Sequence, residues 1–124
     1  MRIADSATAP SLDAVVDPRF GRCAYFIIVD TETTKYEVVP NPSQSATHGA
    51  GIQSAQMLAN KDVKVVLTDN VGPNAYSSLS AAGIQIITGA TGTVRETIER
   101  YKIGELSEAE SPTFRGHSGL NRGL

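Results

Sequence analysis

Hydrophobic and polar positions divide this chain into a series of short strands and helices. Runs of apolar, mostly β-branched residues are typical of strands, and apolar residues that recur every three or four positions are typical of helices. The apolar runs predict five strands, over residues 1–5, 25–31, 36–39, 63–68 and 84–87. The helical spacing predicts three helices, over residues 51–60, 74–82 and 93–102.

The distances between these elements predict how the strands pair. Only a few residues separate the second strand from the third, which is the spacing of an antiparallel hairpin, and Pro40 ends the third strand. Helices separate the later strands, and crossovers of this kind join parallel neighbours. We therefore expect an α/β fold with a mixed five-stranded sheet and helices on both of its faces.

The length of 124 residues suits a single domain with one hydrophobic core. Residues 6–18 offer few side chains to bury and are predicted to form an ordered loop. Residues 107–124 combine glycine and proline with few bulky apolar side chains, too few to offset the entropy of ordering the chain. We expect a domain over residues 1–106 and a disordered tail over residues 107–124.

Charge and cysteine content narrow the classes of partner. The net charge is −2 and the basic residues are scattered, so nucleic acid is not expected as a partner. The longest apolar run, residues 23–29, is about a third of the ~20 residues that a membrane helix needs. A single cysteine cannot form an intramolecular disulfide, and the N-terminus lacks the apolar stretch of a signal peptide. These features predict a cytoplasmic protein with no membrane partner.

Cys23 and His48 are the side chains that a metal ion or an iron–sulfur cluster would prefer. Two ligands do not enclose a cluster, so any bound cluster would be labile, shared with exogenous thiols, or held across a dimer. Each residue also has a plainer interpretation. Cys23 begins an apolar strand and suits a buried position, and His48 suits an ordinary surface loop.

Glycine-rich turns precede two of the predicted helices, at residues 49–51 and 72–74. Such turns expose backbone amides at the positive end of the helix dipole, where anions bind, and Arg22 could add a positive charge. The same turns are also an ordinary way for a chain to enter a helix. Their spacing matches neither a P-loop nor a dinucleotide-binding fingerprint.

Asp5 and Asp69 follow predicted strands, so a metal-dependent hydrolase is an alternative. Two-metal hydrolysis needs a further carboxylate, and the helix predicted over residues 51–60 contains no aspartate or glutamate. Both aspartates also suit the ends of strands in any fold. The sequence therefore favours a protein without catalytic residues.

Several short motifs follow one another over residues 1 to about 106. They are Phe20-Gly21-Arg22, His48-Gly49-Ala50-Gly51, Gly72-Pro73-Asn74-Ala75, Gly83-Ile84, Gly92-Thr93-Val94 and Gly104-Glu105-Leu106. Together they resemble the dinitrogenase iron–molybdenum cofactor biosynthesis family, which includes NifX-type carriers. The resemblance implies a ribonuclease H-like three-layer α/β/α fold and the non-catalytic holding of an iron–sulfur or iron–molybdenum-type cofactor or its precursor.

The residues and the resemblance together define a candidate cofactor site at one end of the sheet. It consists of Gly21, Arg22, Cys23, His48, Gly49, Gly51, Gly72 and Asn74, with His48 and Cys23 as the candidate metal ligands. The expected partner is a cluster donor or acceptor protein, and the expected state is a monomer or weak homodimer. The alternative function is a small protein-interaction or regulatory module that binds no metal.

Overall fold

The computed structural model describes residues 1–46 and 48–113 and has an α/β architecture. The strands are β1 (Arg2–Ala7), β2 (Tyr25–Asp30), β3 (Tyr36–Pro40), β4 (Val63–Leu67) and β5 (Gln85–Ile87). The helices are α1 (Ala50–Asn60), α2 (Pro73–Ala81) and α3 (Val94–Lys102). All eight predicted elements are present, and β1 is longer than predicted, because the first residues of the expected loop 6–18 continue the strand.

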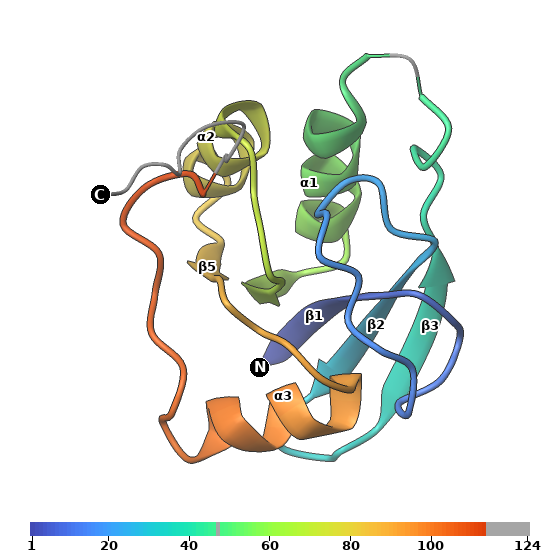
Figure 1. The fold of residues 1–124 in the computed structure, drawn as a ribbon, viewed down its shortest axis with the longest axis vertical. Helices are drawn as coiled ribbons and strands as arrows, with labels where there is room; N and C mark the ends of the chain where they lie inside the picture. Colours follow the sequence, from blue (N-terminus) through green and yellow to red (C-terminus); the bar gives the residue numbers. More distant parts are fainter. Residues whose placement is uncertain (47, 114–124) are drawn as a thin grey trace.

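The sheet is mixed, as the spacing of the elements predicted, with the strand order β3-β2-β1-β4-β5. β2 is antiparallel to both of its neighbours, and β4 is parallel to β1 and β5. Figure 1 shows α1 and α2 side by side over one face of the sheet and α3 across the other, which gives three layers. Within the described residues, no helix is long and apolar enough to cross a membrane.

Side chains that alternate along the strands form two hydrophobic clusters, one on each face of the sheet. Phe26, Ile28 and Val66 pack with Leu58 of α1 and Leu79 of α2. On the opposite face, the apolar side chains of β1, β2, β4 and β5 pack with α3, through Ile3, Ile27, Val65, Leu67, Ile87, Val94 and Ile98. β2, β4 and β5 are mostly buried on both faces, which explains why their sequences are largely apolar, whereas the edge strand β3 is half-buried to exposed.

Residues 107–113 run along the free edge of β5. The sequence instead predicted that the disordered tail begins at residue 107. Glu108 bridges Ile87, and the Ala109 amide donates to the Ile86 carbonyl at 2.7 Å. The Thr113 amide donates to the Val71 carbonyl at 2.8 Å. The segment is held by hydrogen bonds from backbone and side-chain groups, which a count of apolar side chains does not detect. Residues 114–124 lie outside the described residues.

Asp5 is a buried acid of β1 that contacts Thr97 of α3, and 1% of its surface is exposed. Burial raises the pKa of its carboxyl group well above 3.8, and a hydrogen bond with Thr97 and the charge of Arg100 oppose that shift only in part. The Thr97 hydroxyl contacts both Asp5 Oδ2 and, at 2.9 Å, the Val94 carbonyl. One hydroxyl proton cannot serve two acceptors, so this geometry favours the protonated form of Asp5, whose own proton would satisfy the second contact.

Asp5→Asn is therefore expected to stabilise the protein at neutral pH. The pKa of Asp5 is raised in the folded state, whereas the unfolded chain ionises this carboxyl above a pKa near 3.8, so the residue lowers stability as pH rises from 3.8 toward the folded pKa. Asparagine keeps the shape of the aspartate side chain and a hydrogen-bond donor for Thr97, and it does not ionise in the unfolded chain. Urea denaturation from pH 3 to pH 8 should show a variant advantage that grows with pH. An equal free energy of unfolding for both proteins at every pH would contradict the raised pKa of Asp5.

Candidate functional site

Three loops meet at one end of the sheet, where β1, β3 and β4 end and β2 begins. One precedes β2, one joins β3 to α1, and one joins β4 to α2. The Phe20 amide donates to the Asn70 carbonyl at 3.2 Å, which joins the loop before β2 to the loop after β4. A Cβ added to Gly21 would lie 2.9 Å from Gly51 Cα, and one added to Gly51 would lie 2.7 Å from Ala75 Cβ. The loop at Gly21 and the first turns of α1 and α2 are thus in direct contact, and only glycine permits this approach.

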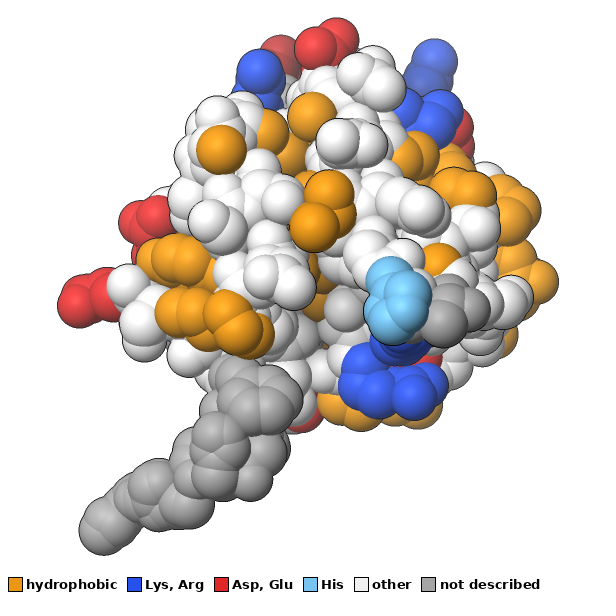
Figure 2. Space-filling model, turned by 90° about the horizontal axis from the view of Figure 1, so that it is seen from above, with side chains coloured by type: hydrophobic (Ala, Val, Ile, Leu, Met, Phe, Trp, Pro, Cys, Tyr) orange, Lys and Arg blue, Asp and Glu red, His pale blue; other side chains and the backbone are white. Residues whose placement is uncertain are grey.

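A cavity of about 270 Å³ lies where these segments meet. Its lining comes from the loop before β2 and the first turns of α1 and α2, and consists of Phe20, Arg22, Gly49, Ala50, Gly51, Ile52, Gly72, Pro73, Asn74 and Ala75. The structure thus brings together five of the predicted site residues: Arg22, Gly49, Gly51, Gly72 and Asn74. Figure 2 looks onto this end of the molecule, where hydrophobic side chains lie among polar ones.

The two helices that begin at the cavity differ from α3 in their N-termini. α1 and α2 have Gly49 and Gly72 as N-caps, and among the described residues no side chain caps them and no acid lies in their first turns. α3 has a complete capping box, in which Thr93 and Glu96 satisfy each other's backbone amides. The positive ends of α1 and α2 are therefore not neutralised by their own first turns and favour an anion.

Asn41, which the sequence analysis did not single out, holds two of the site loops together. It is 7% exposed, and its Nδ2 donates to the carbonyls of Gly21 and Cys23, each at 2.9 Å. Its Oδ1 accepts from the Ser43 amide at 3.1 Å and from the hydroxyls of Ser43 and Ser54, at 2.9 and 3.1 Å. The buried network of Asn41, Ser43 and Ser54 thus connects the loop before β2 to α1.

Arg22 lies on the loop before β2, and His48 lies on the loop that follows β3, next to Gly49 of the cavity lining. The half-buried Arg22 donates from Nη1 to the carbonyls of Ala46 and Gln44, so it orders this loop and also lines the cavity. His48 is exposed and directly precedes Gly49. In Figure 2 the histidine, in pale blue, lies next to a basic side chain, in blue. An imidazole and a guanidinium are therefore available at the rim.

Cys23 lies inside the protein, as the plainer of its two interpretations predicted. Its exposure is 0%, and Sγ lies 3.8 Å from Asn41 Nδ2. Burial, with a smaller contribution from the charge of Asp17, raises the pKa of the Cys23 thiol to about 12. Because metals bind the thiolate, a thiol in this state is a poor ligand. The structure does not bring Cys23 to the cavity beside His48.

Cys23 is accordingly expected to resist thiol reagents while the protein is folded. At pH 8, the folded protein should react with a disulfide reagent at least about a hundredfold more slowly than the protein in urea. In the folded protein the reagent cannot reach the buried thiol, and little of the thiol is ionised to the reactive thiolate. Cys23→Ser should lower stability, since it places a hydroxyl in an apolar cluster. Stoichiometric reaction of the folded protein within seconds would show that the thiol is accessible.

The donor set of the site determines which ligands it can hold. Among residues 1–46 and 48–113, no group of three or more His, Cys, Asp or Glu side chains could hold a metal ion. Asp5 is buried beneath α3, and Asp69 follows β4, so the pair resembles no carboxylate cluster of a two-metal site. The cavity offers instead the amides of two helix N-termini, Arg22 and apolar contacts, a combination that favours an anion.

Comparison with known proteins supports a specific family. The family model described as dinitrogenase iron-molybdenum cofactor matches residues 1–104. The chain belongs to this family. This chain is also similar to an uncharacterized protein of Methanocaldococcus jannaschii, with 34% identity over 98 residues, which cover 77% of this chain and 83% of that protein.

Two solved structures are similar to this chain in fold and in sequence. The apo form of the orange protein from Desulfovibrio gigas is 44% identical, with a TM-score of 0.89, and the match covers 91% of this chain and 96% of that one. A Thermotoga protein named for NifB, solved by NMR, is 39% identical, with a TM-score of 0.82 and a coverage of 93% and 98%. These matches support the mixed five-stranded sheet and its three helices.

Proposed function

We propose that this protein binds and carries an anionic iron–sulfur or iron–molybdenum-type cluster, or a precursor of one, without catalysing a reaction. The observation that carries the proposal is the cavity between the N-termini of α1 and α2, with Arg22 in its lining and His48 at its rim. Family membership supports this class of cargo.

The residues present fit a cluster that arrives with its own sulfide or thiolate ligands. Cys23 is buried with a pKa of about 12, so we propose that it supports the loop rather than binds the cluster. His48 can contribute one coordinate bond or hydrogen bond, and Arg22 one positive charge. Amides of the two first turns stabilise the remaining negative charge. Binding of this kind is reversible, as a carrier requires.

The proposal also covers the fold topology, the partner protein, the oligomeric state and the cellular location. The strand order β3-β2-β1-β4-β5 with an antiparallel β2 supports a ribonuclease H-like topology. We propose a cluster donor or acceptor protein as partner, a monomeric or weakly dimeric state, and a cytoplasmic location, which suits an oxygen-sensitive cargo and a single buried thiol. The disorder predicted for residues 114–124 concerns positions outside the described residues.

The test is anaerobic incubation of the full chain with ferrous iron, sulfide and a small thiol, followed by desalting and an absorption spectrum. We expect a retained chromophore whose yield falls by about threefold or more in His48→Ala, because an exposed loop position costs under ~0.5 kcal/mol in stability but contacts the cargo. Retention should also weaken at high salt, which screens the charges.

The matched control is Gln56→Ala, an exposed change further along α1, which should leave both chromophore yield and stability unchanged. If the wild type retains no chromophore and no iron from a competent donor, the carrier function is wrong. The alternative of an interaction module that binds no metal then stands. An unchanged yield in His48→Ala would remove that residue from the site.

A further inference from the structure

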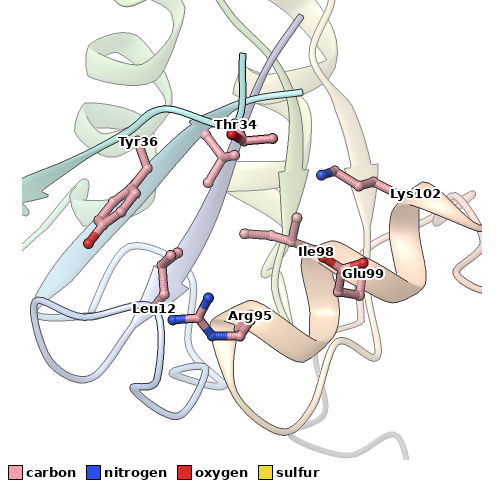
Figure 3. Close-up of a pocket in the computed structure, with 8 residues that line it drawn as sticks. Leu12, Thr34, Tyr36, Arg95, Ile98, Glu99 and Lys102 are labelled. Atoms are coloured by element: carbon pink, nitrogen blue, oxygen red, sulfur yellow. The ribbon is translucent and has the colours of Figure 1, made fainter. Parts of the chain in front are cut away.

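A second hollow lies on the opposite face of the sheet from the α1–α2 cavity. It has a volume of about 240 Å³ and lies between α3 and the hairpin of β2 and β3, as Figure 3 shows. α3 covers the part of this face that β1, β4 and β5 form, through Val94 and Ile98. The part next to the hairpin is left partly open, and the hollow shares no lining residue with the first cavity.

The inner part of this hollow is apolar. Val29 and Ile98, each 5% exposed, form its floor, and the half-buried Leu12 lies beside them. The Tyr36 side chain is 50% exposed and forms the wall on the hairpin side. Figure 3 shows Leu12, Tyr36 and Ile98 around one space. This lining favours a ligand with a small apolar body.

The rim on the α3 side carries one net positive charge, from Arg95, Lys102 and Glu99. Arg95 already donates from Nε to Asp13 Oδ1 at 3.0 Å. Lys102 has no ion pair among the residues that the structure describes, and in Figure 3 its ammonium end extends from α3 toward Thr34, over the hollow. Lys102 is thus the cation available to a ligand.

We propose that the hollow between α3 and the β2–β3 hairpin binds a small organic monoanion with an apolar body, such as an aryl or short-chain carboxylate. Its volume equals that of roughly eight water molecules at about 30 Å³ each, which suits a single ring and a carboxylate. The apolar body packs on Val29, Ile98 and Tyr36, and the carboxylate lies at the Lys102 ammonium. This site is separate from the proposed cargo site and does not depend on it.

The test is a titration of the ¹⁵N-labelled full chain with phenylacetate, followed by NMR amide shifts. A ligand of this size is expected to bind with millimolar affinity. We expect saturable shifts that centre on Tyr36, Ile98 and Lys102. Phenylacetamide, which has the same shape without the charge, should bind about fivefold more weakly, and Lys102→Gln should weaken phenylacetate binding to a similar degree.

Three further variants make the result specific. Lys64→Gln, at an exposed lysine of β4 outside the hollow, should leave the affinity unchanged, whereas Glu99→Gln should strengthen binding because it removes the rim's one carboxylate. Leu12→Trp should fill the hollow and abolish the shifts while the rest of the spectrum is retained. Absence of saturable shifts, equal affinity for the amide, or an unchanged affinity in Lys102→Gln would each overturn the proposal.

Discussion

Asn41→Ala is expected to lower the free energy of unfolding by about 3 kcal/mol or more and to abolish retention of the cluster. The substitution leaves the buried carbonyls of Gly21 and Cys23 without their 2.9 Å donor, and it removes the acceptor for Ser43 and Ser54. Each buried polar group that loses its partner costs about 1–3 kcal/mol. Urea denaturation and the anaerobic reconstitution measure the two effects.

Asn74→Ala is the matched control for this change. Asn74 is exposed and lines the same cavity, so its loss should alter stability by less than about 0.5 kcal/mol. If the two asparagine variants have equal stability, the buried network does not hold the site loops together. If Asn41→Ala is unstable but retains the chromophore under folding conditions, the network stabilises the fold without shaping the site.

Gly51→Ala is expected to destabilise the protein by about 1–3 kcal/mol, the usual cost of overpacking. A glycine-to-alanine change within a helix ordinarily stabilises a protein, by up to about 1 kcal/mol, so the expected destabilisation is the opposite of the usual effect. The new methyl group would lie 2.7 Å from Ala75 Cβ, so α1 and α2 would have to separate at the cavity. Thermal or urea denaturation measures the change.

Two further variants isolate this contact. Gly72→Ala should be close to neutral, because a Cβ at that N-cap would meet nothing within 4 Å. Ala75→Gly, combined with Gly51→Ala, removes the opposing methyl group and should recover part of the lost stability, as a double-mutant cycle would show. Additive effects of the two changes would mean that the helices do not meet at this point.

The elements and their order follow from local patterns that the sequence carries by itself. The spacing of apolar residues predicted all three helices, and the few residues between β2 and β3 predicted the hairpin, because both signals depend on near neighbours in the chain. The crossovers through α1 and α2 then required parallel strands. The convergence of Arg22, Gly49 and Gly72 at one end of the sheet follows from this topology.

Only the tertiary structure distinguished residues of the same type. Gly51 touches Ala75 and Gly72 faces open space, although both occur in glycine-rich turns before helices. Asn41 and Asn74 look equally polar in the sequence, yet one is buried with five hydrogen bonds from its side chain to neighbouring protein groups at 2.9–3.1 Å and the other is exposed.

The sequence by itself determined the fold class, the family and the glycine-rich turns that meet at the cavity, because periodicity and short motifs are properties of neighbouring residues. The tertiary structure decided that Cys23 is buried and His48 exposed, that burial raises the pKa of Asp5, and that Glu108 and Ala109 pair with β5. These outcomes depend on contacts between residues far apart in the chain. Burial and charge at each position arise only when the three layers pack together.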